Sequence, residues 1–159
     1  TYPTYSGFSI MAIVLHPKSR GQVKLKSSNP SEPPSIQLSP LSDLDDRAML
    51  VKGLKKAIEV LHSPAFEAYK EGEMLLPKAP VSDQIINEHI NKSLETLYHP
   101  VGTCKMGNDA QSVVNHELKV HGVANLRVID ASIMPSIVSG NTNAAAIMIA
   151  EKGADMIIG

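Results

Sequence analysis

The stretch Tyr98–Gly107 carries residues whose types and spacing suit proton-transfer chemistry. Pro100 disfavours the α region for the residue before it, so the preceding helix should end at His99 and leave its ring on an irregular loop. Gly102 and Gly107 permit backbone conformations closed to other residues and let a ligand approach closely. An imidazole exchanges protons near neutral pH, so His99 is a candidate general base. A loop histidine bonded only to backbone is the alternative explanation.

A second stretch, about thirty residues further along, has the pattern of a strand, a polar loop and a buried helix. Leu126–Ile129 is a short, largely apolar run followed by Asp130, and the polar loop Ser139–Asn143 precedes a long apolar run. This order is how α/β folds build a ligand crevice. Asn143 stands where unpaired backbone N–H groups collect, so it is either a helix cap or a ligand contact.

Together the two stretches resemble the C-terminal signature of the glucose–methanol–choline family of flavin oxidoreductases. Their residues are most similar to those of its choline-dehydrogenase-like alcohol dehydrogenases. The order, spacing and identity of the motifs agree, most strongly from Tyr98 to Gly159. The resemblance implies FAD-dependent oxidation of an alcohol to an aldehyde or ketone. It also implies a small-molecule alcohol substrate and an electron acceptor, which is a quinone, another carrier or oxygen.

The resemblance assigns catalytic roles to two residues. His99 matches the active-site histidine, which receives the hydroxyl proton while a hydride passes from the alcohol carbon to the flavin. Asn141 matches a position that is Asn or His in the family, and it would hold the alcohol by a hydrogen bond.

The same resemblance assigns four residues to the cofactor. Asp130 and Ala131 would lie along the ribityl and phosphate chain, and Asn143 and Ala144 would offer backbone N–H groups to the pyrimidine end. The G-x-G-x-x-G fingerprint that cradles the FAD pyrophosphate is absent from these 159 residues. The chain is therefore expected to be a fragment whose partner is the missing N-terminal FAD-domain segment of the same protein.

The expected fold is α+β, with an antiparallel sheet and helices followed by a strand and a buried helix. By the resemblance, residues 1–107 form the C-terminal part of a substrate-binding domain and include the active-site loop. Residues 108–159 return to the FAD-binding domain and complete its α/β fold. The sequence leaves the cellular location unknown, and a cytoplasmic location or one peripheral to the inner membrane is expected.

The strands are expected to be short. Phe8–Leu15 and Gln22–Lys26 predict a hairpin around the turn residues His16–Gly21, and Ser35–Leu38 predicts a further strand. Residues 113–129 predict short strands and turns, the last strand being Leu126–Ile129.

Two helices are predicted from capping residues and apolar spacing. The first begins at Ser42 or Asp43 and ends before Pro64, and the second begins at Ser82 and delivers the chain to His99. The apolar faces expected to be buried are Leu44, Ala48, Val51, Leu54, Ile58 and Leu61 in the first helix, and Ile85, Ile86, Ile90, Leu94 and Leu97 in the second.

A last helix should run from near Asn143 toward Ile158. Its segment Ala144–Ala150 is apolar around the whole circumference, so it is expected to be buried. In the family its neighbours lie in the N-terminal FAD domain, and without them it should expose a large apolar patch.

Composition excludes several other classes of protein. Fifteen basic and sixteen acidic residues give a net charge of −1, so nothing argues for nucleic acid or an anionic membrane. The longest apolar run has seven residues, far short of the roughly 20 that span a bilayer. One cysteine excludes an internal disulfide, and the start Thr1-Tyr2-Pro3 suggests a chain cut from a longer protein.

Two rival functions remain open at this stage. A non-catalytic binding or interaction domain could keep the same fold without the chemistry. A metal-binding module could use His99, Cys104, His116 and His121, although no pair among them has a zinc-like spacing, and no metal site is expected.

Overall fold

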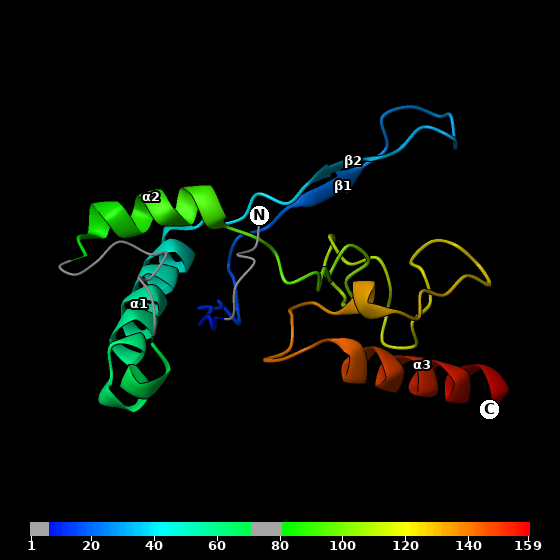
Figure 1. Cartoon of the computed structure of the whole chain (residues 1–159). Helices are drawn as coiled ribbons and strands as arrows, with labels where there is room; N and C mark the ends of the chain where they lie inside the picture. The colour runs from blue at the N-terminus through cyan, green and yellow to red at the C-terminus, as the bar shows by residue number, and fades with distance from the viewer. Residues whose placement is uncertain (1–6, 71–80) are drawn as a thin grey trace. The chain divides into compact units, whose positions relative to one another are not determined.

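A computed structural model describes residues 7–70 and 81–159 of the chain (Figure 1). These residues fall into two compact units. The first contains the described parts of Thr1–Val14 and Leu41–Glu95, and the second contains Leu15–Pro40 and Thr96–Gly159. No helix among the described residues has the length and apolar character needed to cross a membrane.

The first unit is helical. Helix α1 spans Leu44–Leu61, the 3₁₀ helix η1 spans Pro64–Tyr69, and helix α2 spans Asp83–Ser93 (Figure 1). The predicted helix starts are confirmed, because Asp43 caps α1 by accepting a 2.8 Å hydrogen bond from the Asp45 amide. Ser82 caps α2 in the same way, accepting from the amide of Ile85 at 3.3 Å.

Helices α1 and α2 share a small core made by Leu50, Ile86 and Ile90. The guanidinium of Arg47 donates to the side-chain oxygens of Asn87 and Asn91, each at 2.9 Å, and so adds polar links between the two helices. The predicted buried face of α1 is confirmed only in part. Leu61 is buried and Val51 and Leu54 pack on the core, as predicted. Leu44 is 81% exposed instead, and Leu50 and Ala57 are buried although they were not predicted to be.

The prediction that the second helix reaches His99 is wrong, because α2 ends at Ser93 and Leu94 has extended backbone (ψ 123°). Most of the stability of a helix in a protein comes from packing of its apolar face. Leu94 and Leu97 are 39% and 42% exposed, so this stretch buries too little apolar surface to prolong α2.

The second unit contains a two-stranded antiparallel sheet. Strand β1 (Gln22–Lys24) pairs with β2 (Ser35–Gln37), with Val23 opposite Ile36. The predicted hairpin over residues 8–26 is therefore wrong, since residues 8–15 form no strand and the partner of β1 follows it in the chain. The physical reason is packing: Ala12 and Val14 lie against the α1–α2 core instead.

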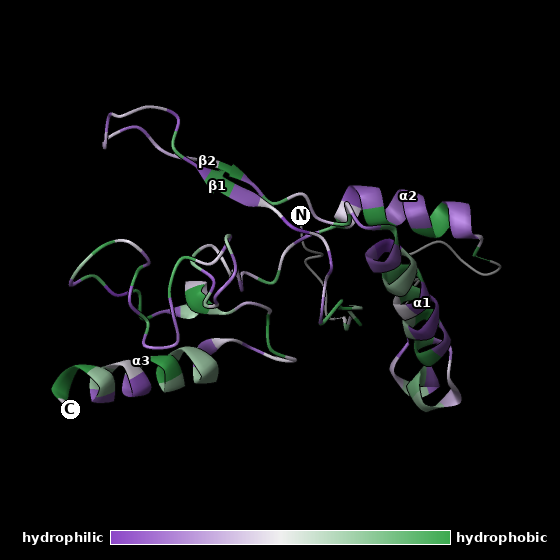
Figure 2. Cartoon of the chain, turned by 180° about the vertical axis from the view of Figure 1, so that it is seen from behind, coloured by the Kyte–Doolittle hydropathy of each residue, from purple (hydrophilic) through white to green (hydrophobic). Residues whose placement is uncertain are grey.

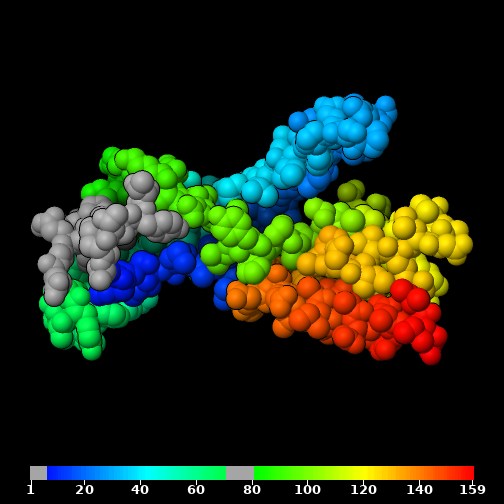
Figure 3. All heavy atoms as spheres, turned by 45° about the vertical axis from the view of Figure 1, so that its right-hand side comes forward, coloured from blue at the N-terminus to red at the C-terminus, as the bar shows by residue number. Residues whose placement is uncertain are grey.

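Helix α3 (Asn143–Ile158) has the bounds that the sequence predicts. It follows the short 3₁₀ helix η2 (Ala131–Ile133) and packs on the core of the second unit. Figure 3 shows α3 in orange to red lying along the yellow and gold segment that precedes it. The buried members of that core are Val114, Leu118, Ile133, Met134 and Ile149.

The predicted strand Leu126–Ile129 is not part of a sheet. Arg127 forms an isolated antiparallel bridge with Lys119, and Val114 bridges Met106 and Val120. A strand needs neighbours along its length to satisfy its N–H and C=O groups. The described residues supply neighbours at single positions, so the segment stays extended without becoming a ladder.

The prediction that α3 is buried on all sides is also wrong for this chain. Ile149 and Gly153 face the core, but Ile147, Met148 and Ile158 are 55%, 59% and 84% exposed. In Figure 2 most of α3 has the green colour of hydrophobic residues, interrupted by purple hydrophilic ones. The exposed apolar side predicted for a chain without its neighbours is therefore present.

Gly153 provides a test of how α3 is seated. A Cβ added there would lie 2.9 Å from Cδ1 of Ile129 and closer still to Cγ2, which is too short for real side-chain contacts. In the complete protein, Gly153→Ala should lower the free energy of unfolding by about 1–3 kcal/mol through overpacking, partly offset by about 1 kcal/mol of better helix propensity. Denaturant melts would measure this change.

The double variant Ile129→Ala/Gly153→Ala is the control for that prediction. Removing the branched side chain vacates the space that the new methyl group needs, so the two substitutions should couple favourably by at least about 0.5 kcal/mol. Strictly additive effects would contradict the close approach of α3 to Ile129.

Candidate active site

His99 lies on a loop of the second unit and is half-buried. The residue before it, Tyr98, has a positive φ of 59°, which is uncommon for a residue other than glycine. Pro100 follows, so the backbone on both sides of the imidazole is conformationally restricted. The ring is therefore presented by a segment with few alternative conformations.

The loop after His99 is attached to the segment that contains η2. The amide of Cys104 donates to the carbonyl of Ser132 at 3.0 Å, and the amide of Met106 donates to the carbonyl of Ile133 at 2.8 Å. These backbone bonds seat the loop on residues that belong to the core of the unit.

Gly102 makes this approach possible. Its φ is +86°, a conformation that residues with a Cβ adopt at a cost. A Cβ built there would also lie 3.2 Å from the carbonyl oxygen of Met134. The sequence predicts that this glycine lets a ligand approach closely, but the group beside Gly102 in the structure is the Met134 carbonyl of the protein itself.

The imidazole of His99 meets the start of α3. Oγ1 of Thr142 lies 3.0 Å from Nδ1 of His99, a part-buried hydrogen bond between residues 43 positions apart. Thr142 is only 9% exposed and precedes the first helical residue, yet its side chain makes no capping bond to the helix. Across residues 7–70 and 81–159, Nε2 of His99 has no hydrogen-bond partner, so this nitrogen remains open to a ligand.

Asn141 and Asn143, the two asparagines of the polar loop, flank Thr142 in the chain. Asn141 immediately precedes Thr142 and is exposed, and Asn143 is exposed as the first residue of α3. Thr142 rather than Asn143 takes the cap position, so the capping alternative for Asn143 is wrong. The side chain of Asn143 is thereby left facing solvent.

The first backbone N–H groups of α3 have no hydrogen-bond acceptor within the helix. The first helix-type bond here runs from the Ala146 amide to the Thr142 carbonyl at 2.9 Å. The amides of Asn143 and Ala144 precede that bond and have no partner within the helix. Both residues are exposed.

Asp130 and Ala131 lie at the start of η2, which precedes α3 in the chain. One carboxylate oxygen of Asp130 accepts from the Ser132 amide at 2.7 Å and caps η2, which Ala131 begins. Asp130 is exposed and its second oxygen stays available. The residue therefore has a structural role that is compatible with a ligand contact.

Two other titratable groups of the second unit, His121 and Asp109, have hydrogen-bond partners in the protein. Nε2 of His121 lies 3.0 Å from the carbonyl of Gly107, and His116 is exposed. A hydrogen bond from Lys105 and a second from the backbone amide of Gln111 lower the pKa of Asp109. Among the described residues, no three His, Cys, Asp or Glu side chains gather as a metal site would require.

Two contacts made by the polar loop Ser139–Asn143 were missed by sequence reasoning. One is the Thr142–His99 hydrogen bond, and the other joins Nε2 of His16 to Oγ of Ser139 at 2.6 Å. The turn pattern around His16 predicts only a solvated side chain. Each contact links residues more than forty positions apart, and no local sequence signal encodes such a pairing.

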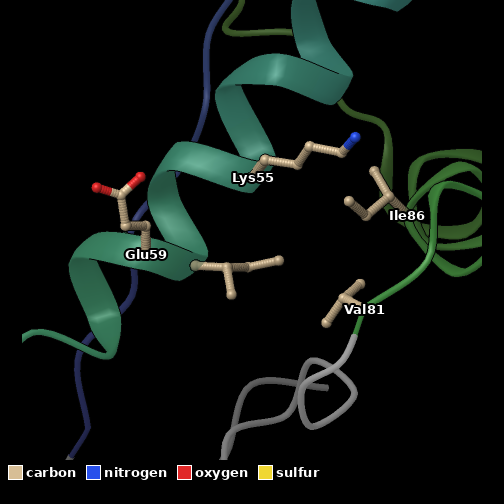
Figure 4. A pocket seen from close by; sticks show the side chains of 5 residues that line it. Lys55, Glu59, Val81 and Ile86 are labelled. Atoms are coloured by element: carbon tan, nitrogen blue, oxygen red, sulfur yellow. The ribbon is translucent and has the colours of Figure 1, made fainter.

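A cavity of about 230 Å³ lies in the first unit, away from these residues in the chain (Figure 4). Its walls are Lys55, Ile58, Glu59, Val81 and Ile86. The ammonium of Lys55 is paired with the carboxylate of Asp83 at 2.5 Å, so this charge is already engaged. None of the predicted site residues lines the cavity.

Comparison with known proteins gives the family. A family model described as GMC oxidoreductase matches residues 17–150. The chain is 44% identical over 152 residues to the alcohol dehydrogenase [acceptor] of Pseudomonas putida. It is 41% identical over 153 residues to the oxygen-dependent choline dehydrogenase of Escherichia coli O157:H7.

Each of these alignments covers 96% of this chain but only 28% and 27% of the respective relatives. Among solved structures, the FAD-dependent oxidoreductase from Chaetomium thermophilum superposes with a TM-score of 0.83 at 32% identity. That match covers 90% of this chain and 25% of the other. The chain thus corresponds to about a quarter of each of these proteins.

Proposed function

The chain belongs to the GMC oxidoreductase family, and from this premise we propose that it supplies the C-terminal catalytic portion of an enzyme that oxidises an alcohol to an aldehyde or ketone. The observation that carries the proposal is the 3.0 Å contact between His99 and Thr142. It joins the two sequence stretches that can do chemistry. The relatives named for oxidation of alcohols and choline support the substrate class.

In this proposal His99 is the general base. Its Nδ1 is engaged by Thr142, so Nε2 is the atom that accepts the hydroxyl proton of the substrate. Asn141 is exposed one residue before Thr142 and can hold the alcohol oxygen through its side-chain amide. Asn141 would orient the alcohol and His99 would take its proton, because a side-chain amide cannot act as the base.

The residues at the start of α3 fit one end of a flavin. Asn143 and Ala144 are exposed and their backbone N–H groups have no helical partner, which suits an acceptor-rich ring edge. Asp130 and Ala131 would contact the ribityl and phosphate chain, and Asp130 retains a free carboxylate oxygen. The bound FAD would supply the hydride acceptor for the oxidation.

A complete active site requires more than these residues. We propose that an N-terminal FAD-domain segment of the same protein supplies the pyrophosphate cradle, because no G-x-G-x-x-G occurs among the 159 residues. In the same scheme residues 1–107 belong to the substrate-binding domain and residues 108–159 return to the FAD domain. An electron acceptor (a quinone, another carrier or oxygen) completes the cycle.

The first test is His99→Ala in the complete flavoprotein. Loss of the base should lower kcat/KM for the alcohol by roughly 10²-fold or more, while flavin absorbance shows that the cofactor stays bound. His116→Ala is the matched control, since His116 is an exposed histidine of the same unit. An alanine variant within about threefold of the unmodified enzyme would rule out His99 as the base.

Asn141 gives a second test. Asn141→His should retain measurable turnover because imidazole can also hydrogen-bond the alcohol, whereas Asn141→Leu should lose most of it. Leucine has a similar volume but leaves the bound hydroxyl without a partner, which costs about 1–3 kcal/mol in a closed site. Steady-state rates with an artificial acceptor measure both variants. Equal rates for the unmodified enzyme and the Asn141→Leu variant would show that this side chain does not hold the substrate.

A third test uses the 159-residue chain by itself. Apolar side chains such as Ile147, Met148 and Ile158 are exposed, and the phosphate cradle is not among these residues. We expect a poorly soluble or loosely packed product that binds no FAD and oxidises no alcohol. Quenching of flavin fluorescence by excess purified chain is the measurement. Stoichiometric binding at micromolar affinity would contradict the proposal that most of the cofactor site lies outside this chain.

A further inference from the structure

We infer that Thr142 is a positioning residue that sets the orientation of the His99 imidazole. This inference rests on the proposed function, in which His99 is the base. It assigns a role to a residue that neither sequence motif singles out. Thr142 itself would touch neither the alcohol nor the flavin.

The geometry restricts which nitrogen can be the base. Nδ1 of His99 is 3.0 Å from Oγ1 of Thr142, while Nε2 has no partner in the described part of the chain. A neutral imidazole carries one N–H and one lone pair, and a hydroxyl can either donate or accept. For Nε2 to hold the lone pair, Nδ1 must carry the hydrogen and donate it to Thr142.

Burial gives this hydrogen bond its selectivity. Thr142 is 9% exposed, so water competes poorly for the Nδ1–H group. Turning the imidazole over would break this part-buried bond, because a ring carbon would then face the hydroxyl. A buried donor without a partner is costly, and the hydroxyl therefore favours one orientation of the ring.

The backbone makes the Thr142 hydroxyl available. Thr142 occupies the cap position of α3 with αR backbone (φ −79°, ψ −9°), and its hydroxyl caps no amide of the helix. Its carbonyl accepts from the Ala146 amide at 2.9 Å, so the backbone is already committed to the helix. The hydroxyl of Thr142 is therefore available for the hydrogen bond to His99.

Both partners are also fixed by the same hydrophobic core. Val101, two residues after His99, and Ala145, three residues after Thr142, both pack on the cluster that contains Ile133, Met134 and Ile149. The hydrogen bond therefore joins two anchored segments. A positioning role depends on such rigidity, since a misplacement of about 1 Å can cost roughly 10²-fold in rate.

The test compares Thr142→Val with Thr142→Ser in the complete flavoprotein. Valine keeps the shape without the hydroxyl, and kcat should fall by about tenfold or more with KM within about threefold. Serine keeps the hydroxyl and should restore most of kcat. Ser28→Ala, which removes an exposed hydroxyl from the segment between β1 and β2, is the control and should leave kcat unchanged.

A spectroscopic readout separates positioning from stability. In protein labelled with ¹⁵N-histidine, with His99 assigned by comparison with His99→Ala, Nδ1 should give the signal of a protonated nitrogen and Nε2 that of an unprotonated one. In Thr142→Val the Nδ1–H group loses its hydrogen-bond partner, so the Nδ1 signal should shift. The spectrum of the unmodified protein decides the tautomer even if the valine variant loses flavin or fails to fold.

The outcomes also distinguish this inference from the proposed function. A hydrogen on Nε2 in the unmodified protein would overturn the arrangement in which Nδ1 donates to Thr142. A valine variant with unchanged kcat and spectrum, while His99→Ala is inactive, would overturn the positioning role of Thr142. An active His99→Ala enzyme would instead overturn the proposed function.

Discussion

The close approach of two backbone segments governs the second unit of this protein. Residues 102–106 lie against residues 132–134, with Gly102 facing the Met134 carbonyl and two amides bonded to the carbonyls of Ser132 and Ile133. A side chain at position 102 would meet that carbonyl and require a strained φ. Everything that gives His99 a defined surrounding follows from this approach, because the loop begins at His99 and the opposing segment leads on to Thr142.

The core beneath this contact is small and depends on few side chains. Val114 is fully buried, and Ile133, Met134 and Ile149 complete the cluster with Leu118. Gly153 lets α3 approach Ile129 so that one face of the helix closes this core. The opposite face carries Ile147 and Met148 in solvent, where exposed apolar area is unfavourable by about 25 cal/mol per Å². Burial on one side only agrees with a chain that spans about a quarter of its relatives.

The polar groups of the candidate site are divided between structure and chemistry. One oxygen of Asp130 caps η2, and the hydroxyl of Thr142 contacts Nδ1 of His99. Three groups make no hydrogen bond to the described residues: Nε2 of His99, the side chain of Asn141 and the first amides of α3. Groups with unsatisfied hydrogen-bonding capacity at one place are what a substrate or cofactor can use.

Local features were predictable from sequence wherever the determining interactions are local. The caps at Asp43 and Ser82 and both ends of α3 follow from short-range hydrogen bonds and apolar periodicity, so they appear where expected. The family and the candidate His99 and Asn141 also came from sequence, because motif identity is a property of the chain itself.

Pairing over long distances was decided by the tertiary structure alone. The partner of β1 was mistaken because residues 8–15 could satisfy their apolar side chains against α1 and α2 as well as in a hairpin. The end of α2 and the exposed side of α3 depend on which surfaces are present to pack against. The contact between Thr142 and His99 spans 43 residues, and only folding of both segments onto one core brings a hydroxyl to that nitrogen.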